Sequence, residues 1–74
     1  MATVKVFSGK KIREFRESAG LSQVELGAML GLLNRQQISY YEIGASVPTA
    51  NRLADIARAL DVLVDDLFED KQVE

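Results

Sequence analysis

The chain has 74 residues, of which 47% are hydrophobic, a formal net charge of −2, and neither cysteine nor histidine. These values predict one small globular domain with a single apolar core and exclude a disordered chain, disulfides and thiolate or imidazole metal sites. They also remove the usual general bases and thiol nucleophiles, so we expect no enzyme activity, no cofactor, no metal and no small-molecule substrate.

The first element in chain order is an N-terminal arm. Residues 1–8 alternate weakly between apolar and polar side chains, which fits either a short strand or an extended segment. Ser8 is a candidate N-cap for a helix that ends at Gly20. The apolar stripe of this helix comprises Ile12, Phe15 and Ala19.

Two short helices joined by a tight turn follow. Ser22 and Glu25 form a capping box that opens the second helix, and Gly31 ends it. Asn34 caps a third helix, which Gly44 terminates. The residues expected to face inward are Leu26, Met29, Leu30, Ile38 and Tyr41. This arrangement is typical of a helix-turn-helix, which places its second helix in a DNA major groove.

The C-terminal part predicts two more helices. Pro48 marks a loop, and Thr49 caps a fourth helix that runs to about Leu60. Residues 61–68 are expected to form a turn and a short fifth helix. The predicted fold is therefore all-α, a compact domain of five helices. Its core is expected to contain Phe15, Leu26, Leu30, Ile38, Tyr41, Leu53 and Leu60.

The charges are divided unevenly along the chain. Residues 1–52 carry seven basic and four acidic side chains, a net of +3, whereas residues 53–74 carry two and seven, a net of −5. Such a division suggests one face that approaches phosphates and another that avoids them. A solvated acidic tail without a partner explains the last six residues equally well.

The expected organisation is an arm at 1–8, a DNA-binding domain at 9–69 and an acidic C-terminal tail at 70–74. No apolar run approaches the ~18 residues of a membrane span, and no signal-peptide core is present, so we expect no membrane partner and a cytoplasmic protein, associated with the nucleoid when bound to DNA. The apolar residues near the C-terminus either complete the core or form a two-fold dimer seam. They are Leu63, Val64 and Phe68.

The order and spacing of these elements resemble the Cro/phage-repressor type of helix-turn-helix, the lambda-repressor-like five-helix domain of the xenobiotic-response-element family. The matching segments are GKKIREFRESAGLSQVELGAMLG, ISYYEIG, the Pro-containing loop and RLADIARALDVLVDDLF, roughly residues 9–68. One departure is that six residues separate Gly31 from Ile38, where the family pattern has five. If the turn absorbs the extra residue, Leu32 or Leu33, the third helix keeps its register; otherwise the base-reading set rotates by about 100°.

The resemblance implies which residues contact DNA. Arg35, Gln36 and Tyr40 match the positions from which family members read bases, and Arg and Gln suit guanine and adenine edges. Phosphate contacts are expected from Gln23, Gln37, Ser39, Asn51 and Arg52. Lys10 and Arg13 are weaker candidates, since ordinary solvated charges explain them as well.

The resemblance also implies a structural ion pair. Arg16 on the first helix is expected to pair with Glu42 near the end of the third helix, partly buried. Such a bidentate pair fixes the angle between helices more than it adds net stability. We therefore expect Glu42→Ala to destabilise the fold and to weaken DNA binding indirectly.

The sequence favours a regulator, with repression the favoured outcome, that binds double-stranded DNA in a sequence-specific manner. A homodimer would read a two-fold symmetric operator with half-sites ~34 Å apart, each third helix lying in a major groove. The alternative is a protein-interaction module, such as an antitoxin or adaptor, whose acidic C-terminal half meets a protein partner. Steep loss of affinity with salt would distinguish DNA binding from apolar protein binding.

Overall fold

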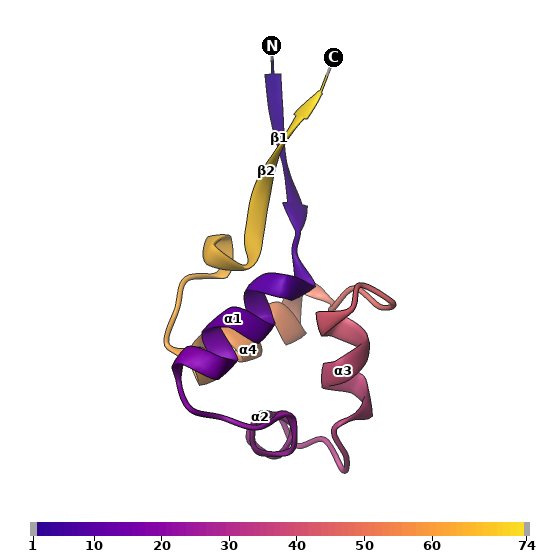
Figure 1. The fold of residues 1–74 in the computed structure, drawn as a ribbon, viewed down its shortest axis with the longest axis vertical. Helices are drawn as coiled ribbons and strands as arrows, with labels where there is room; N and C mark the ends of the chain where they lie inside the picture. The colour runs from indigo at the N-terminus through magenta and orange to yellow at the C-terminus, as the bar shows by residue number, and fades with distance from the viewer. Residues whose placement is uncertain (1, 74) are drawn as a thin grey trace.

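The computed structural model describes residues 2–73, which form a helical body and a projecting β-hairpin (Figure 1). The body contains α1 (Gly9–Ser18), α2 (Gln23–Met29), α3 (Gln36–Glu42) and α4 (Ala50–Leu60), followed by a 3₁₀ helix, η1 (Val64–Leu67). The strands β1 (Ala2–Phe7) and β2 (Phe68–Val73) pair in antiparallel register. We call this two-stranded sheet the hairpin, although its strands come from opposite ends of the chain and no turn joins them. Ala2 and Val73, the outermost described residues, are paired at the far end of the hairpin.

The prediction of an all-α fold with five helices is wrong at the C-terminus. The expected fifth helix is one 3₁₀ turn, in which the Leu63 backbone N–H donates to the Asp66 carboxylate at 2.9 Å. After this turn the chain continues as the strand β2, because Phe68 pairs with Phe7 of β1. Phe7 lies at the other end of the sequence, so no local pattern indicates this partner. The segment at 1–8, left open between strand and arm, forms a strand at 2–7. The segment expected as a tail at 70–74 lies in β2 as far as residue 73; Met1 and Glu74 fall outside the described residues.

The core lies between the four helices and the 3₁₀ turn. Its fully buried side chains are Ile12, Leu26, Ile38, Ile56 and Leu67. Five of the seven expected core residues are buried, and Phe15 and Leu30 pack against them while partly exposed. Ala19 and Met29 were expected to face inward but lie at the surface, because each stands at or just beyond the last turn of its helix.

The helix ends follow the side-chain pattern closely. In the predicted capping box, the Ser22 hydroxyl accepts from the Glu25 N–H at 3.0 Å, and the Ser22 N–H donates to the Glu25 carboxylate at 2.9 Å. The Thr49 hydroxyl accepts from the backbone of α4 as expected. Ser8 occupies the N-cap of α1 without a side-chain hydrogen bond. The Asn34 side-chain amide oxygen accepts from the first N–H of α3 at 2.9 Å, although Arg35 occupies the N-cap and the helix starts at Gln36.

One close approach fixes α1 against α3. A Cβ placed on Gly9 would overlap the carbonyl oxygen of Tyr41 and lie 2.9 Å from its carbonyl carbon. Because both atoms belong to the backbone, a side chain at position 9 cannot be accommodated by a rotamer change. The start of α1 therefore holds the end of α3, the helix that matters for the site described next.

Candidate nucleic-acid interface

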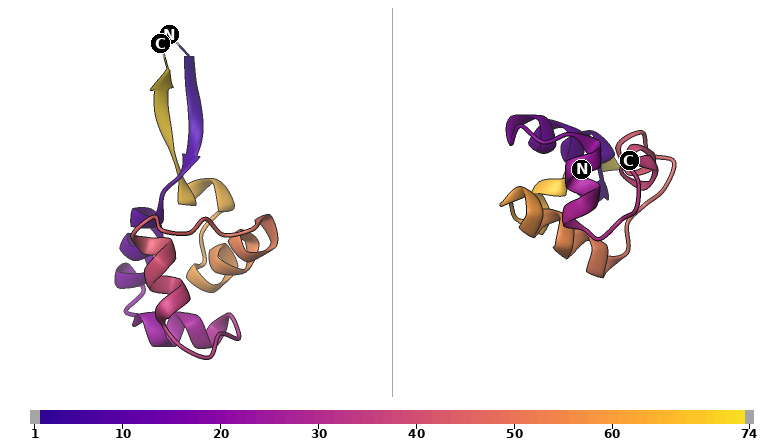
Figure 2. Two further views of the ribbon diagram at one scale, coloured as in Figure 1. Left: turned by 90° about the vertical axis from the view of Figure 1, so that its right-hand side faces the viewer. Right: turned by 90° about the horizontal axis from the view of Figure 1, so that it is seen from below.

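The helix α3 runs along one side of the body, and its N-terminal end is the one remote from the hairpin (Figures 1 and 2). Ile38 and Tyr41 are buried, so the inward face of α3 is the one expected from the sequence. In the preceding turn, Leu32 is half-buried against α2, whereas Leu33 is 102% exposed. The extra residue is thus accommodated in the turn, ahead of α3.

The outward face of α3 carries the residues expected to read bases. Arg35 and Gln36 are exposed, and Tyr40 is 40% exposed. The side-chain amide of Gln36 donates a hydrogen bond to the Tyr40 hydroxyl at 2.6 Å, one helical turn away. With Asn34 and Ser39, these residues line a shallow, open depression. The face is therefore polar, accessible and rich in paired donors and acceptors.

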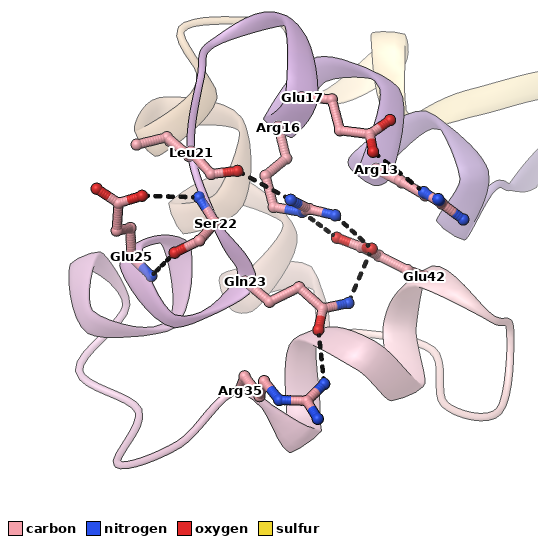
Figure 3. Close-up of polar contacts among 9 residues, drawn as sticks. All are labelled: Arg13, Arg16, Glu17, Leu21, Ser22, Gln23, Glu25, Arg35 and Glu42. Atoms are coloured by element: carbon pink, nitrogen blue, oxygen red, sulfur yellow. Dashed lines mark hydrogen bonds and ion pairs between the residues drawn. The ribbon is translucent and has the colours of Figure 1, made fainter.

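A chain of four polar side chains connects this face to the interior (Figure 3). The Arg16 guanidinium binds both Glu42 carboxylate oxygens, at 2.6 and 3.1 Å. The Gln23 amide nitrogen donates to the same carboxylate at 3.1 Å. The Arg35 guanidinium then donates to the Gln23 amide oxygen, also at 3.1 Å. We call this series of contacts the Arg16–Arg35 relay; it links α1, α3, α2 and the turn residue before α3.

The inner part of the relay is shielded from water. The side chains of Arg16 and Glu42 are only 11% and 3% exposed, and Arg16 also donates to the Leu21 carbonyl at 2.8 Å. The hydrogen bond to Glu42 raises the pKa of Arg16 above its ordinary value, against a smaller opposing effect of burial. The guanidinium is therefore permanently charged, and the pair fixes α3 against α1.

The residues expected to contact phosphates have different roles within the protein. Gln23 is half-buried in the relay, and the Gln37 amide donates to the Ser46 hydroxyl at 3.3 Å, which ties α3 to the following loop. Ser39 is half-buried on α3. In α4, Asn51 is exposed.

Arg52 has a structural contact that the sequence did not indicate. Its guanidinium donates to the Leu30 carbonyl at 3.0 Å and so satisfies a backbone group at the end of α2.

The two weaker candidates lie on α1: Lys10 is exposed, and Arg13 lies 3.5 Å from Glu17 in an exposed pair. The structure therefore gathers Arg35, Gln36, Ser39 and Tyr40 on one surface, and Gln37 lines an adjoining open depression with Gln36 and Tyr40. The other candidates lie on α1, α2 and α4.

The hydrogen bond between Arg35 and Gln23 was also missed by the sequence analysis, because the two residues are twelve positions apart on different elements. Within residues 2–73, no cluster of three acidic, His or Cys side chains could hold a metal ion. In the same range, no helix is both long and apolar enough to cross a membrane.

Comparison with known proteins agrees with this geometry. A helix-turn-helix family model matches residues 12–67. An uncharacterized HTH-type transcriptional regulator of Sinorhizobium medicae is 40% identical over 67 residues, which cover 90% of this chain and 48% of the relative. An uncharacterized HTH-type transcriptional regulator of Archaeoglobus fulgidus is 36% identical over 58 residues, 78% of this chain and 81% of the relative. The chain spans about half the length of the first of these relatives.

Two solved structures share the fold. The P22 c2 repressor in complex with synthetic operator 9T has a TM-score of 0.76 and 29% identity, over 84% of this chain and 92% of the repressor chain. The restriction-modification controller protein C.AhdI from Aeromonas hydrophila has a TM-score of 0.75 and 33% identity, over 81% and 89% of the two chains. The chain therefore belongs to the helix-turn-helix family of DNA-binding transcription regulators, and within it to the Cro/phage-repressor type.

Proposed function

We propose that this protein is a sequence-specific regulator of transcription, a repressor, that binds double-stranded DNA as a homodimer. Each α3 would lie in the major groove of one half of a two-fold symmetric operator. The observation that carries the proposal is the exposed face of α3, where Gln36 and Tyr40 are accessible beside Arg35. The operator complex of the similar P22 c2 repressor supports this use of the fold.

Each base-reading residue has a chemically defined task. The Arg35 guanidinium can donate two hydrogen bonds to guanine, and the Gln36 amide can both donate to and accept from adenine, each worth ~1–3 kcal/mol of discrimination. Tyr40 can pack against a thymine methyl or bind a phosphate. The bonds to Gln23 and Tyr40 hold Arg35 and Gln36 in place before DNA arrives, which reduces the entropy lost on binding.

Phosphate contacts position the domain on the duplex. We assign this role to Gln23, Gln37, Ser39, Asn51 and Arg52. The Gln23 amide nitrogen gives one hydrogen to Glu42 and keeps a second for a phosphate oxygen. Arg52 likewise uses one of its five N–H groups on Leu30.

The apolar residues proposed as a dimer seam are divided in the structure. Phe68 packs edge-on against Phe7 with ring centroids 6.2 Å apart, at the base of the hairpin. Leu63 and Val64 are 72% and 39% exposed. If this region forms the seam, Leu63 and Val64 are the residues available to a partner.

Selection of bound duplexes from random DNA, at two salt concentrations, tests the function directly. We expect a two-fold symmetric enriched site whose affinity falls steeply with salt, because each neutralised phosphate contributes about −0.9 to the slope of log affinity against log salt. Enrichment of no sequence, or of an asymmetric one, would contradict the proposal.

Variants then assign the roles within the site. Arg35→Ala is expected to relax preference at one base position per half-site. Arg58→Ala is the matched control, because that side chain is 81% exposed on α4 and pairs only loosely with Asp55 at 3.9 Å. If Arg35→Ala lowers affinity equally for every sequence, Arg35 contacts only phosphate.

A second candidate function is a protein-interaction module, such as an antitoxin or adaptor. Its support is the acidic group at the hairpin end of the molecule, where Asp65, Asp66 and Glu69 are exposed, remote from the start of α3. The two functions are compatible, since a regulator can also bind a protein partner. In either case we place the protein in the cytoplasm, and at the nucleoid when it is bound to DNA.

A further inference from the structure

The β-hairpin lies outside the helix-turn-helix, and the proposed DNA contacts give it no role. It has two strands, projects from the body, and is exposed along most of its length (Figure 1). An isolated two-stranded hairpin is at best marginally stable in water, and stability requires a third strand or a covering element. Within residues 2–73 nothing covers the outer part of this hairpin, so both of its edges offer unpaired backbone N–H and C=O groups.

The two faces of the hairpin differ in chemistry. Directly opposed residues of an antiparallel pair project to the same face. One face holds the Phe7–Phe68 pair, a Lys5–Asp70 ion pair at 3.2 Å, and Thr3 opposite Gln72. The other face carries a row of three apolar side chains of β1, which lie opposite charged residues and Val73 of β2. The opposed pairs on this face are Ala2 with Val73, Val4 with Lys71, and Val6 with Glu69.

The two edges differ as well. The sequence of β2, FEDKQV, places three charged residues in a row, and charged side chains protect an edge strand from pairing with another chain. The sequence of β1, ATVKVF, has one charge, Lys5, which Asp70 already neutralises. The exposed edge of β1 therefore lacks the usual protection.

We infer that β1 pairs antiparallel with β1 of a second copy of this chain, around a two-fold axis at Val4. This deepens the homodimer of the proposed function and rests on that part of it alone. The pairing produces a four-stranded sheet in the order β2–β1–β1–β2. The backbone N–H and C=O groups on the free edge of each β1 then find hydrogen-bond partners in the other copy. Val4 lies opposite Val4 of the second copy, and Ala2 lies opposite its Val6.

The distribution of charge favours pairing at this edge over pairing at the edge of β2. Around the axis at Val4, the only charged residue of β1, Lys5, faces the neutral Thr3 of the second copy. An equivalent axis on β2 would place Glu69, Asp70 or Lys71 directly opposite its own copy. Like charges directly opposite one another are destabilising, whereas β-branched pairs stabilise a sheet.

The pairing places both α3 helices on one side of the dimer. In the left view of Figure 2, the two strands lie beside each other while α3 is at the front. A two-fold axis perpendicular to the sheet points toward the viewer, so both α3 helices of the dimer face the same side. Because one chain already measures 42 × 22 × 21 Å, the dimer is elongated, with a helical body at each end of the sheet.

Sedimentation equilibrium without DNA tests the pairing. The wild-type chain is expected to dimerise, and Val4→Lys and Val4→Glu, each alone, to raise the dissociation constant at least about tenfold through like-charge repulsion. A mixture of the two variants is expected to recover the dimer as a heterodimer. Leu63→Lys tests the alternative seam at Leu63 and Val64, and the β1 pairing predicts that this variant leaves dimerisation unchanged. Val24→Lys, on an exposed apolar residue of α2, is the matched control.

A cross-linking experiment is independent of any effect of charge on folding. The chain has no cysteine, so a single Val4→Cys variant gives an unambiguous result. Opposed residues of an antiparallel pair have Cα atoms about 4.5–5.5 Å apart, within the range of a disulfide. Oxidation of Val4→Cys is expected to produce a disulfide-linked dimer, and oxidation of Val64→Cys is not.

Three results would overturn the inference: a wild-type chain that stays monomeric up to millimolar concentration, a dimer that Leu63→Lys dissociates and Val4→Lys does not, or cross-linking through Val64→Cys alone. None of these measurements involves DNA. Failure of the β1 pairing is therefore distinguishable from failure of DNA recognition, which the duplex selection tests separately.

Discussion

Replacement of Glu42 by alanine removes the centre of the Arg16–Arg35 relay. The carboxylate is 3% exposed and accepts three hydrogen bonds, two from Arg16 and one from Gln23. Breaking a buried pair typically costs about 3–5 kcal/mol, because the remaining charge stays buried without a partner. Arg16 keeps its bond to the Leu21 carbonyl and 11% exposure, so we expect the lower end, about 3 kcal/mol.

A loss of this size is large for the domain. At roughly 0.05–0.15 kcal/mol per residue, the whole chain is stable by about 4–11 kcal/mol. For a domain of 60–100 residues, 3 kcal/mol corresponds to a fall in Tm of roughly 12–24 °C. Urea unfolding followed by far-ultraviolet circular dichroism measures the change in the free energy of unfolding.

Two further variants show whether burial is the cause. Glu17→Ala removes an exposed ion pair in which the side chains of Arg13 and Glu17 are 63% and 56% exposed. This change is expected to lower the free energy of unfolding by at most about 1 kcal/mol. The double variant Arg16→Met with Glu42→Leu replaces both charges with apolar groups and is expected to recover most of the lost stability. If Glu42→Ala and Glu17→Ala differ by less than about 0.5 kcal/mol, the reasoning is refuted.

Three other changes have defined outcomes. Gly9→Ala forces a Cβ onto the backbone of Tyr41 and is expected to cost at least about 1–3 kcal/mol in urea unfolding; an unchanged midpoint would show that α1 and α3 can separate freely. Thr49→Ala removes the cap of α4 and is expected to cost ~1 kcal/mol by the same assay, a prediction that a neutral effect would contradict. The hydrogen bonds with Ser22 hold the pKa of Glu25 below its ordinary value of 4.5, so their stabilisation is present above that pH and is lost as the pH falls through the lowered pKa. Glu25→Gln keeps the cap without titrating, so its stability is expected to fall less than that of the wild type between neutral pH and about pH 3, and equal pH dependence would count against this account.

The helical body could be predicted from the sequence because its signals are local. The capping box at Ser22 and Glu25, and the apolar spacing of α4, lie within one or two turns of the helices that they define. The register of α3 also follows from its own residues, since Ile38 and Tyr41 are the positions that lie one turn apart on the inward side.

The hairpin could not be predicted in the same way. Its pairs join residues from opposite ends of the chain, such as Lys5 with Asp70, and nothing near either residue indicates the other. The short segment 61–68 has apolar residues at spacings that fit either a helix or a strand. With eight residues it is also too short for its length to distinguish the two.

Within the site, the sequence predicted which side chains lie on α3 but not how they contact one another. Arg35 and Gln36 were placed from the resemblance, and the structure shows the same two residues exposed. Their hydrogen bonds to Gln23 and Tyr40 depend on the angle between α2 and α3 and on rotamers. Contacts of this kind arise from tertiary packing, which local patterns do not encode.

Mapping of the bound surface by NMR tests most directly whether the outward face of α3 meets DNA. Titration of the isotopically labelled protein with its selected duplex is expected to perturb the backbone amides of residues 34–40 and the side-chain amides of Gln23 and Gln36 most strongly. The acidic residues of η1 and β2 are expected to change little. Perturbations concentrated at η1 and β2, with α3 unaffected, would contradict the account.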